Sequence, residues 1–445
     1  MLKSKLPEKS HMRVLLFAYA CEPHCGSEAG IGWNWAWNLA ELGHEVWVLT
    51  RFDGKNAIER ELASNPMPNL HIIYVDVPNW IKRYVRGRFI ELYAYYAHYL
   101  GWQKAAYDMA LSLDRKYDLD LVHHVSWSGL NTGSWLSKFN KPFIFGPIGG
   151  GQIAPSGFKK YFLNNWKHEF IRSSMVKLIT LNRFVCNTVR RADLVLATNR
   201  DTLNLTKELG AKRVEMFLDV GVPEDYFPEQ PPIRPSSEEL RLIWVGGIYP
   251  RKGLRLALEA LSQVKDIVPF KMTILGGGQL SDCVPGWIEE FGLEDRVIYR
   301  GRVSWMEVKQ EYLNSDAFLF TSLRDSFGMQ LIEAMGLALP IITLDHHGAK
   351  DFVPQKAGIK VPVTSPTEVV KGLAQAIQYM FEHPQERLQM GRVGYEFAKT
   401  ESWKQKAIKM SQLYKKVVVG EQVTAREPGK VPQLSNTLAS ADAAQ

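Results

Sequence analysis

Two carboxylates that stand eight positions apart, Asp325 and Glu333, flank a Phe-Gly pair just before an apolar run at residues 339–343. We expect residues 325–328 to form a loop and residues 329–337 a helix, which places Glu333 about one turn inside that helix. A carboxylate there can accept hydrogen bonds from a ribose diol, while the free amides at the helix start face phosphate. This spacing predicts a nucleotide site. The alternative is an ordinary loop entering a buried helix, with Glu333 on its exposed edge.

A second segment upstream has the chemistry to bind a diphosphate. Residues 241–247 predict a short buried strand that ends in a glycine turn, and Lys252 and Gly253 then open a helix with leucines at helical spacing. Glycines let the backbone approach a ligand closely, and Arg251, Lys252 and the helix N-terminus supply positive potential. The alternative is that Arg251 and Lys252 form a solvated surface pair.

The order and spacing of these two segments resemble the retaining glycosyltransferases of family 4. That family carries Gly-Arg, a short loop and Lys-Gly, followed later by two glutamates that flank Phe-Gly. Here Lys252-Gly253 matches the Lys-Gly and Glu333 matches the second glutamate. Two positions depart from the pattern, because Gly247 stands where the family has arginine and Asp325 where it has the first glutamate.

The resemblance implies a set of site residues. In the family, a glycine loop after the first strand touches the donor diphosphate, and a histidine lies near the donor sugar. Either His123 or His124 fits that position, and residues 146–152 are expected to line the same cleft. The candidates for catalysis are Lys252, Asp325 and His124, and those for donor binding are Gly30, Gly32, Gly246, Gly247, Arg251, Lys252, Val303, Asp325, Phe327, Gly328, Met329 and Glu333.

The implied reaction moves a hexosyl group from a UDP-sugar or GDP-sugar to a hydroxyl of a saccharide or lipid-linked acceptor, with retention of anomeric configuration. Its setting would be polysaccharide or glycolipid biosynthesis. We expect no metal and no cofactor, because Lys252, Arg251 and helix amides would stabilise the departing diphosphate. The alternatives are a non-catalytic nucleotide-sugar-binding protein and a phosphorylase or epimerase with the same fold.

The elements that must position these residues follow an α/β pattern. Strand-length apolar runs alternate with helix-length segments, which predicts doubly wound parallel sheets. In the first half the runs lie at residues 13–19, 45–50, 70–75, 119–124, 143–145 and 193–197. The resemblance implies the GT-B fold, in which two Rossmann-like domains face a central cleft and a C-terminal helix crosses back to the first. We expect an acceptor-binding domain at 12–228, a nucleotide-sugar-binding domain at 239–400, the crossover helix at 401–418 and a disordered tail at 419–445.

Composition agrees with this organisation. The chain has 445 residues, of which 46% are hydrophobic and 23% charged, so it can bury two cores. Its four cysteines are too few and too scattered for a disulfide scaffold, which favours a cytoplasmic protein. The apolar run at residues 14–21 is too short for a secretory signal or a membrane-spanning helix.

Charge bears on the partners. The formal net charge is +7, and the basic excess lies mainly within residues 80–200. Residues 80–89 and 158–191 mix aromatic and basic side chains, which is typical of a helix lying on an anionic membrane surface. The alternative is a basic outer surface over a buried aromatic stripe. Nucleic acid is not expected, since no recognition motif accompanies the charge. We therefore expect a sugar-nucleotide donor, a saccharide or lipid-linked acceptor and peripheral contact at the cytoplasmic face of a membrane.

Overall fold

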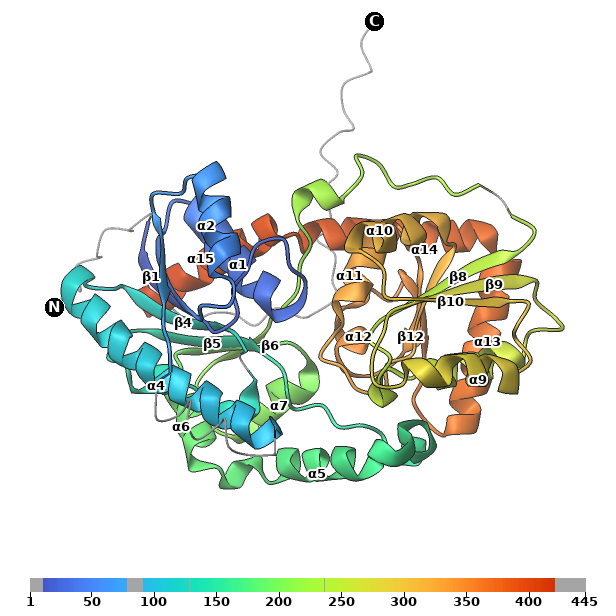
Figure 1. Ribbon diagram of the computed structural model, residues 1–445, viewed down its shortest axis with the longest axis horizontal. Helices are drawn as coiled ribbons and strands as arrows, with labels where there is room; N and C mark the ends of the chain where they lie inside the picture. The colour runs from blue at the N-terminus through green and yellow to red at the C-terminus, as the bar shows by residue number, and fades with distance from the viewer. Residues whose placement is uncertain (1–10, 78–90, 128, 236, 421–445) are drawn as a thin grey trace, which may run out of the picture.

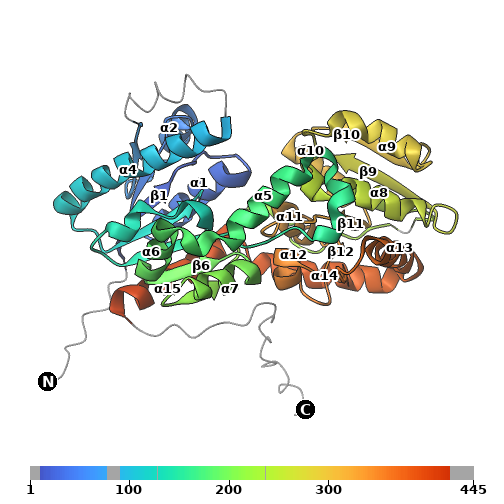
Figure 2. The ribbon, with the colours of Figure 1, turned by 90° about the horizontal axis from the view of Figure 1, so that it is seen from below.

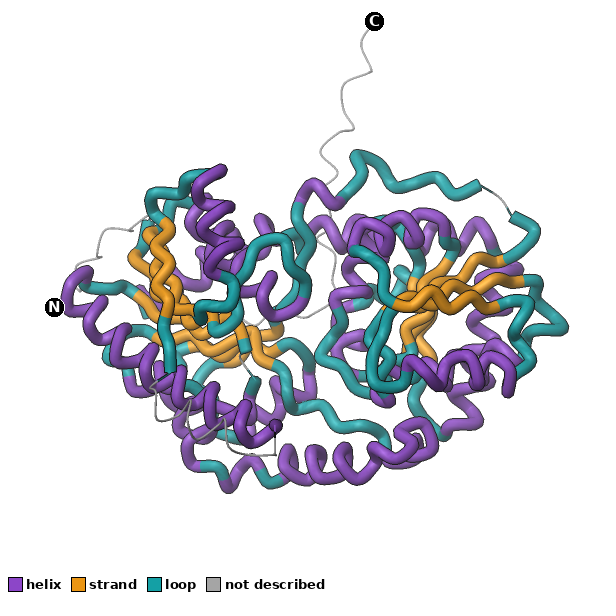
Figure 3. Tube along the Cα trace, viewed as in Figure 1, coloured by secondary structure: helices purple, strands orange, loops and turns teal. Residues whose placement is uncertain are grey.

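The computed structural model describes residues 11–77, 91–127, 129–235 and 237–420, which form two lobes side by side (Figure 1). The predicted basic segment at residues 80–89 lies outside the described residues, as does residue 421 onward of the predicted tail. Each lobe is built on one sheet, and the two sheets are separate in the trace (Figure 3).

The first lobe holds a seven-stranded parallel sheet in the order β3-β2-β1-β4-β5-β6-β7. Alternate residues of β1 face opposite cores: Val14 and Leu16 pack with α1, whereas Leu15 and Phe17 pack with α4. The strands are β1 Arg13–Ala18, β2 Glu45–Thr50, β3 Leu70–Tyr74, β4 Leu121–Ser126, β5 Phe143–Ile148, β6 Leu194–Ala197 and β7 Val214–Met216. The helices are α1 Ser27–Glu41, α2 Lys55–Ser64, α4 Glu91–Tyr117, α5 Trp166–Lys177, α6 Arg183–Arg191 and α7 Arg200–Glu208.

The second lobe holds a six-stranded parallel sheet in the order β10-β9-β8-β11-β12-β13. Helices α8 and α13 pack on one face, while α11 and α14 pack on the other. The strands are β8 Leu240–Val245, β9 Phe270–Leu275, β10 Val297–Gly301, β11 Ala317–Phe320, β12 Ile341–Leu344 and β13 Gly358–Val361. The helices are α8 Leu254–Ser262, α9 Val284–Glu290, α10 Trp305–Asn314, α11 Met329–Gly336, α12 His347–Phe352, α13 Pro366–Glu382 and α14 Pro384–Thr400.

The last helix, α15 (Trp403–Val419), crosses from the second lobe back to the first (Figure 1). The Ser402 side chain caps its start by accepting from the amide of Gln405. The Trp403 ring meets Trp35 of α1 at 5.6 Å between centroids, and Ser411 Oγ lies 2.8 Å from His44 Nε2. The predicted doubly wound α/β fold of two Rossmann-like lobes with a crossover helix is confirmed.

A second connection, on the side of α5, was not predicted. The 3-10 segment Ser156–Asn165 precedes α5, and its side chains Phe158, Tyr161 and Phe162 are buried in the core of the second lobe. The Tyr161 hydroxyl donates to Glu259 of α8 at 2.8 Å. Seen from below, α5 and this segment extend from the first lobe to the second (Figure 2). In addition to the contacts of α15, the lobes are therefore connected by residues 156–177.

Candidate functional site

The two predicted donor motifs meet at the carboxyl end of the second sheet. Gly253 has φ 68°, and a Cβ there would lie 2.2 Å from the carbonyl oxygen of Thr321. The Thr321 hydroxyl donates to the Gly253 carbonyl at 2.8 Å. Only glycine allows this contact, and it brings Lys252, at the start of α8, beside Asp325 in the loop after β11.

Lys252 and Asp325 form an ion pair inside the site. The Lys252 side chain is buried and its ammonium donates to Asp325 Oδ2, while Arg251 Nη1 lies 3.6 Å from Oδ1. Burial lowers the pKa of Lys252 more than the Asp325 carboxylate raises it. Burial also raises the pKa of Asp325, but the charges of Lys252 and Arg251 outweigh it and hold that pKa below its usual range. Asp325 is therefore ionised at neutral pH.

Two further arginines, which the sequence motifs did not indicate, extend this cluster. Arg324 Nε lies 2.7 Å from Glu169 Oε1 of α5, and Arg172 Nη1 lies 3.8 Å from the same oxygen. Burial, followed by the charge of Arg324, lowers the pKa of Arg172 to about 10. The cluster sets four basic side chains against the carboxylates of Asp325 and Glu169, an excess of two positive charges; the four are Arg172, Arg251, Lys252 and Arg324.

Glu333 lies in α11 and is buried. Its Oε1 accepts a hydrogen bond from the Trp305 indole nitrogen at 2.9 Å, and the Trp305 ring lies 5.2 Å from that of Tyr226. Burial raises the pKa of Glu333. Val303 precedes Trp305 in the loop between β10 and α10, so it lies at the same end of the sheet as Glu333.

The loop between Asp325 and α11 is fixed by packing. Phe327 is buried and its ring meets that of Phe352 at 5.9 Å between centroids. Gly328 has φ 113° and precedes Met329, the first residue of α11, which packs against the core. The buried Phe327 ring thus fixes the loop against the core. At Phe327 and Gly328, a ligand could contact only the backbone.

The glycine at position 247 leaves room for the Tyr249 ring. Gly246 and Gly247 follow β8, and a Cβ at Gly247 would lie 2.5 Å from Tyr249 Cε2. An arginine at this position would therefore displace the Tyr249 ring.

The first-lobe glycines pack against the loop that precedes α1. Gly30 and Gly32 are buried within α1. A Cβ on Gly30 would lie 1.9 Å from the carbonyl oxygen of Cys25, and one on Gly32 would lie 2.0 Å from that of Ala20. Both glycines face the loop that precedes their own helix, and their contact with the donor diphosphate stays a prediction.

The proposed involvement of His124 in catalysis requires correction. His124 is fully buried on β4; its Nε2 lies 3.0 Å from the Tyr99 hydroxyl and its Nδ1 2.8 Å from Ser134 Oγ. His123 points to the other face of the sheet, with Nδ1 2.6 Å from the Tyr414 hydroxyl of α15. Because both ring nitrogens of His124 are used inside the core, we assign it a structural role.

This burial predicts a measurable dependence of stability on pH. Burial lowers the pKa of both His123 and His124 to about 3 from an ordinary value of 6.5. Since the folded state resists protonation, each contributes stability above pH 6.5 that is lost as the pH falls toward 3, by about 1.4 kcal/mol per pH unit. Urea unfolding at several pH values should show that the free energy of unfolding falls with this slope for each histidine. The variant His124→Gln should lose the contribution of His124 to that slope. The exposed His168→Gln is the matched control; an equal change in both variants would contradict the assignment.

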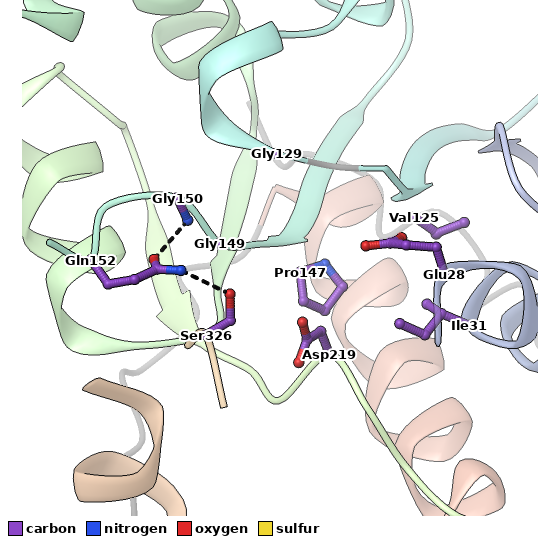
Figure 4. A pocket seen from close by; sticks show the side chains of 10 residues that line it. All are labelled: Glu28, Ile31, Val125, Gly129, Pro147, Gly149, Gly150, Gln152, Asp219 and Ser326. Atoms are coloured by element: carbon purple, nitrogen blue, oxygen red, sulfur yellow. Dashed lines mark hydrogen bonds between the residues drawn. The ribbon is translucent and has the colours of Figure 1, made fainter. Parts of the chain in front are cut away.

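A pocket between the lobes is lined by Ser326, the residue that follows Asp325 in the chain (Figure 4). Its volume is about 240 Å³. Four residues of the predicted cleft segment 146–152 line this pocket, and Ser326 of the second lobe closes the other side. Glu28 and Asp219 were missed, because neither stands in a recognisable motif. The lining residues are Glu28, Ile31, Val125, Gly129, Pro147, Gly149, Gly150, Gln152, Asp219 and Ser326.

The second lobe matches a known protein family. Residues 227–397 match the family model described as "Glycosyl transferases group 1". The chain is also similar to WcaL of Escherichia coli K12, provisionally named a colanic acid biosynthesis glycosyltransferase, with 30% identity over 194 residues; the match covers 42% of this chain and 48% of WcaL. The chain thus spans about half the length of the curated relatives it matches.

Solved structures match over both lobes. Sucrose-phosphate synthase of Thermosynechococcus elongatus aligns with a TM-score of 0.66 and 19% identity, covering 92% of this chain and 99% of that chain. Anabaena HepE in complex with UDP and glucose aligns with a TM-score of 0.57 and 16% identity, covering 91% and 99%. The fold is GT-B, and the chain contains a glycosyl transferases group 1 domain, which confirms the family resemblance drawn from the sequence.

Proposed function

We propose that this protein is a retaining, metal-independent glycosyltransferase. It would move a hexosyl group from a UDP-sugar or GDP-sugar to a hydroxyl of a saccharide or lipid-linked acceptor. The observation that carries the proposal is the buried basic cluster at the start of α8, where Lys252 and Arg251 surround Asp325 with an excess of positive charge. A nucleoside diphosphate carries the complementary charge.

The chemistry follows from that charge. Negative charge builds on the departing diphosphate as the anomeric bond breaks, so Lys252 and Arg251 would stabilise the transition state more than the ground state. Asp325 would orient hydroxyls of the transferred sugar, and Glu333 would accept hydrogen bonds from the ribose. A diphosphate oxygen would assist the incoming hydroxyl on the face that the leaving group vacates, which retains the anomeric configuration.

The named ligands and pathways of similar proteins support this assignment. The HepE structure holds UDP and glucose, and WcaL is named for the biosynthesis of a polysaccharide. We therefore favour a nucleotide sugar as donor and the assembly of a polysaccharide or glycolipid as the setting.

The test is incubation of the protein with a panel of UDP-sugars and GDP-sugars, with and without sugar acceptors. Nucleotide release that depends on acceptor supports a transferase. Release of free nucleotide without any glycoside product indicates a hydrolase, and saturable binding without release indicates the non-catalytic binder. Gly247 favours that last alternative, because it removes an arginine that the resembled family places at this point.

We further propose that α5 contacts the anionic, cytoplasmic face of a membrane. Phe170, Ile171 and Met175 of α5 are exposed, as are Lys177 at the end of α5 and Arg183 at the start of α6. The helix runs along the outer surface of the molecule (Figure 2). Apolar side chains bordered by bases suit a lipid interface. Among the described residues, each helix falls short of the length or apolarity that crossing a bilayer demands.

Replacing Phe170 and Met175 by serine should weaken binding to vesicles that contain phosphatidylglycerol, because it removes apolar area that would enter the interface. Co-sedimentation at low and physiological salt measures the effect. Ile267→Ser, which alters an exposed apolar side chain of the second lobe, is the control. Binding that persists in the double variant would remove α5 from the proposed contact.

A further inference from the structure

The pocket between the lobes contains two carboxylates that the proposed donor site does not use. Glu28 stands in the first turn of α1, and Asp219 lies in the segment that follows β7. Both line the pocket, with Pro147 between them and Ser326 opposite (Figure 4). Carboxylates that face one cavity repel each other, so a ligand that donates hydrogen bonds to them would stabilise this arrangement.

One carboxylate oxygen of Asp219 is available to accept a hydrogen bond. Its Oδ1 is buried and has no hydrogen-bond partner among the residues that the structure describes. Leaving a buried carboxylate oxygen unpaired is costly, and such groups in native structures point to a missing partner. Burial, followed by the charge of Glu28, raises the pKa of Asp219 to about 7, although the charge of Lys406 acts in the opposite direction. A ligand that donates a hydrogen bond to Asp219 Oδ1 would remove the cost of leaving this buried oxygen unpaired.

Glu28 presents its carboxylate to the same space. The backbone amide of Trp127 donates to Glu28 Oε2 at 2.8 Å, which holds the side chain in place. Burial raises the pKa of Glu28, and this hydrogen bond lowers it in part. The position of Glu28 is therefore fixed by the loop after β4, with the carboxylate turned toward the pocket.

The rest of the lining offers a donor and an apolar wall. Gln152 Nε2 donates to Ser326 Oγ at 3.1 Å, and Gln152 Oε1 is held by the amide of Gly150 at 2.9 Å. Because Ser326 Oγ accepts from Gln152, its own proton is available to a ligand. Ile31 and Val125 line the same pocket with aliphatic surface. Hydroxyls that both donate and accept, on a ring with an apolar face, match this mixture.

The size and place of the pocket limit the ligand. Its volume of about 240 Å³ is below the range of roughly 300–1,000 Å³ for larger ligands, so it suits one small ring. Ser326 follows Asp325, and the Asp325 charge contributes to the raised pKa of Asp219. A ring in this pocket would therefore lie next to the sugar that Asp325 is proposed to orient.

We propose that Glu28 and Asp219 form the acceptor subsite, in which their carboxylates accept hydrogen bonds from hydroxyls of a neutral sugar ring. This inference rests on the proposed transferase function and adds the acceptor side to it. The carboxylates would select the acceptor by its hydroxyl pattern and hold the reacting hydroxyl beside the donor sugar.

Saturation-transfer NMR with methyl glycosides of glucose, galactose, mannose and N-acetylglucosamine tests the subsite directly. The wild-type protein should show transfer to at least one glycoside, and Asp219→Asn and Glu28→Gln should each raise its Kd at least tenfold. Asp225→Asn and Glu208→Gln, which change exposed side chains, should leave the Kd unchanged. Circular dichroism would show that the variants are folded. Absence of transfer in the wild type, or undiminished transfer in both pocket variants, would overturn the proposal.

Nucleotide binding separates this inference from the proposed function. Calorimetry with UDP and GDP should give the same affinity for wild type, Asp219→Asn and Glu28→Gln. Lys252→Ala should lose nucleotide affinity yet keep sugar binding. Loss of nucleotide binding in the pocket variants would move these carboxylates to the donor site and overturn the acceptor assignment. Sugar binding without any nucleotide binding by the wild type would instead refute the proposed transferase.

Discussion

Replacement of Lys252 by alanine is expected to cut turnover with the preferred nucleotide sugar at least roughly tenfold. The ammonium is buried against Asp325, where its interaction with a diphosphate is screened little by water. Its removal leaves Arg251 as the nearest cation to Asp325, at 3.6 Å, and lowers the positive charge available to the departing group. Product formation under saturating donor is the measurement, because the effect belongs to the transition state.

Lys356→Ala supplies the matched control, since Lys356 is exposed on the second lobe. Thermal unfolding of both variants separates loss of chemistry from loss of structure. Full transfer by a folded Lys252→Ala protein would remove Lys252 from the mechanism. Equal losses in both variants would show that the activity depends on overall charge.

The sheets could be predicted because their strands are buried on both faces. Apolar runs at residues 13–19 and 45–50 correspond to β1 Arg13–Ala18 and β2 Glu45–Thr50. The edge strand β7, Val214–Met216, has only three half-buried residues and was missed. A short edge strand has too little apolar pattern to separate it from a loop.

The donor motifs could be predicted because each is local in sequence. The residues that contact those motifs could not be predicted, since they come from distant segments of the chain. Arg324 pairs with Glu169 of the first lobe, and nothing near either residue indicates the other. Asp219 follows β7 in a segment without a recognisable motif, and only the folded structure places it in one pocket with Glu28 and Ser326.

The local sequence pattern also failed to predict which side chains are buried and which are exposed. His123 and His124 are adjacent on one strand, so they must point to opposite sides of the sheet. Both sides are covered, one by α15 and the other by α4, and both histidines are buried. In the aromatic and basic stretch at residues 158–191, Phe158 enters the core of the second lobe whereas Phe170 is exposed. The buried-stripe interpretation thus holds for Phe158, whereas contact of this stretch with a membrane stays a prediction.

Arg234 gives the largest expected effect on stability. It lies in the linker between the predicted domains 12–228 and 239–400, yet its guanidinium is buried. The guanidinium donates to the carbonyls of Ser315 at 2.6 Å, Leu337 at 2.7 Å and Ala338 at 2.9 Å. These carbonyls follow the ends of α10 and α11, where the helix dipole favours a cation. The linker arginine therefore caps two helices, one of which carries Glu333.

Arg234→Ala should destabilise the second lobe by about 3 kcal/mol, because it leaves several buried carbonyls without donors. For a domain of this size that corresponds to a fall of roughly 6–12 °C in the melting midpoint, measurable by calorimetry. Arg392→Ala removes an exposed arginine of α14 and should leave the midpoint unchanged. Arg234→Lys keeps the charge but cannot reach all three carbonyls, so its midpoint should lie between those of the wild type and the alanine variant. An unchanged midpoint for Arg234→Ala would mean that water satisfies the carbonyls equally well, and the linker would then be a passive connection between the lobes.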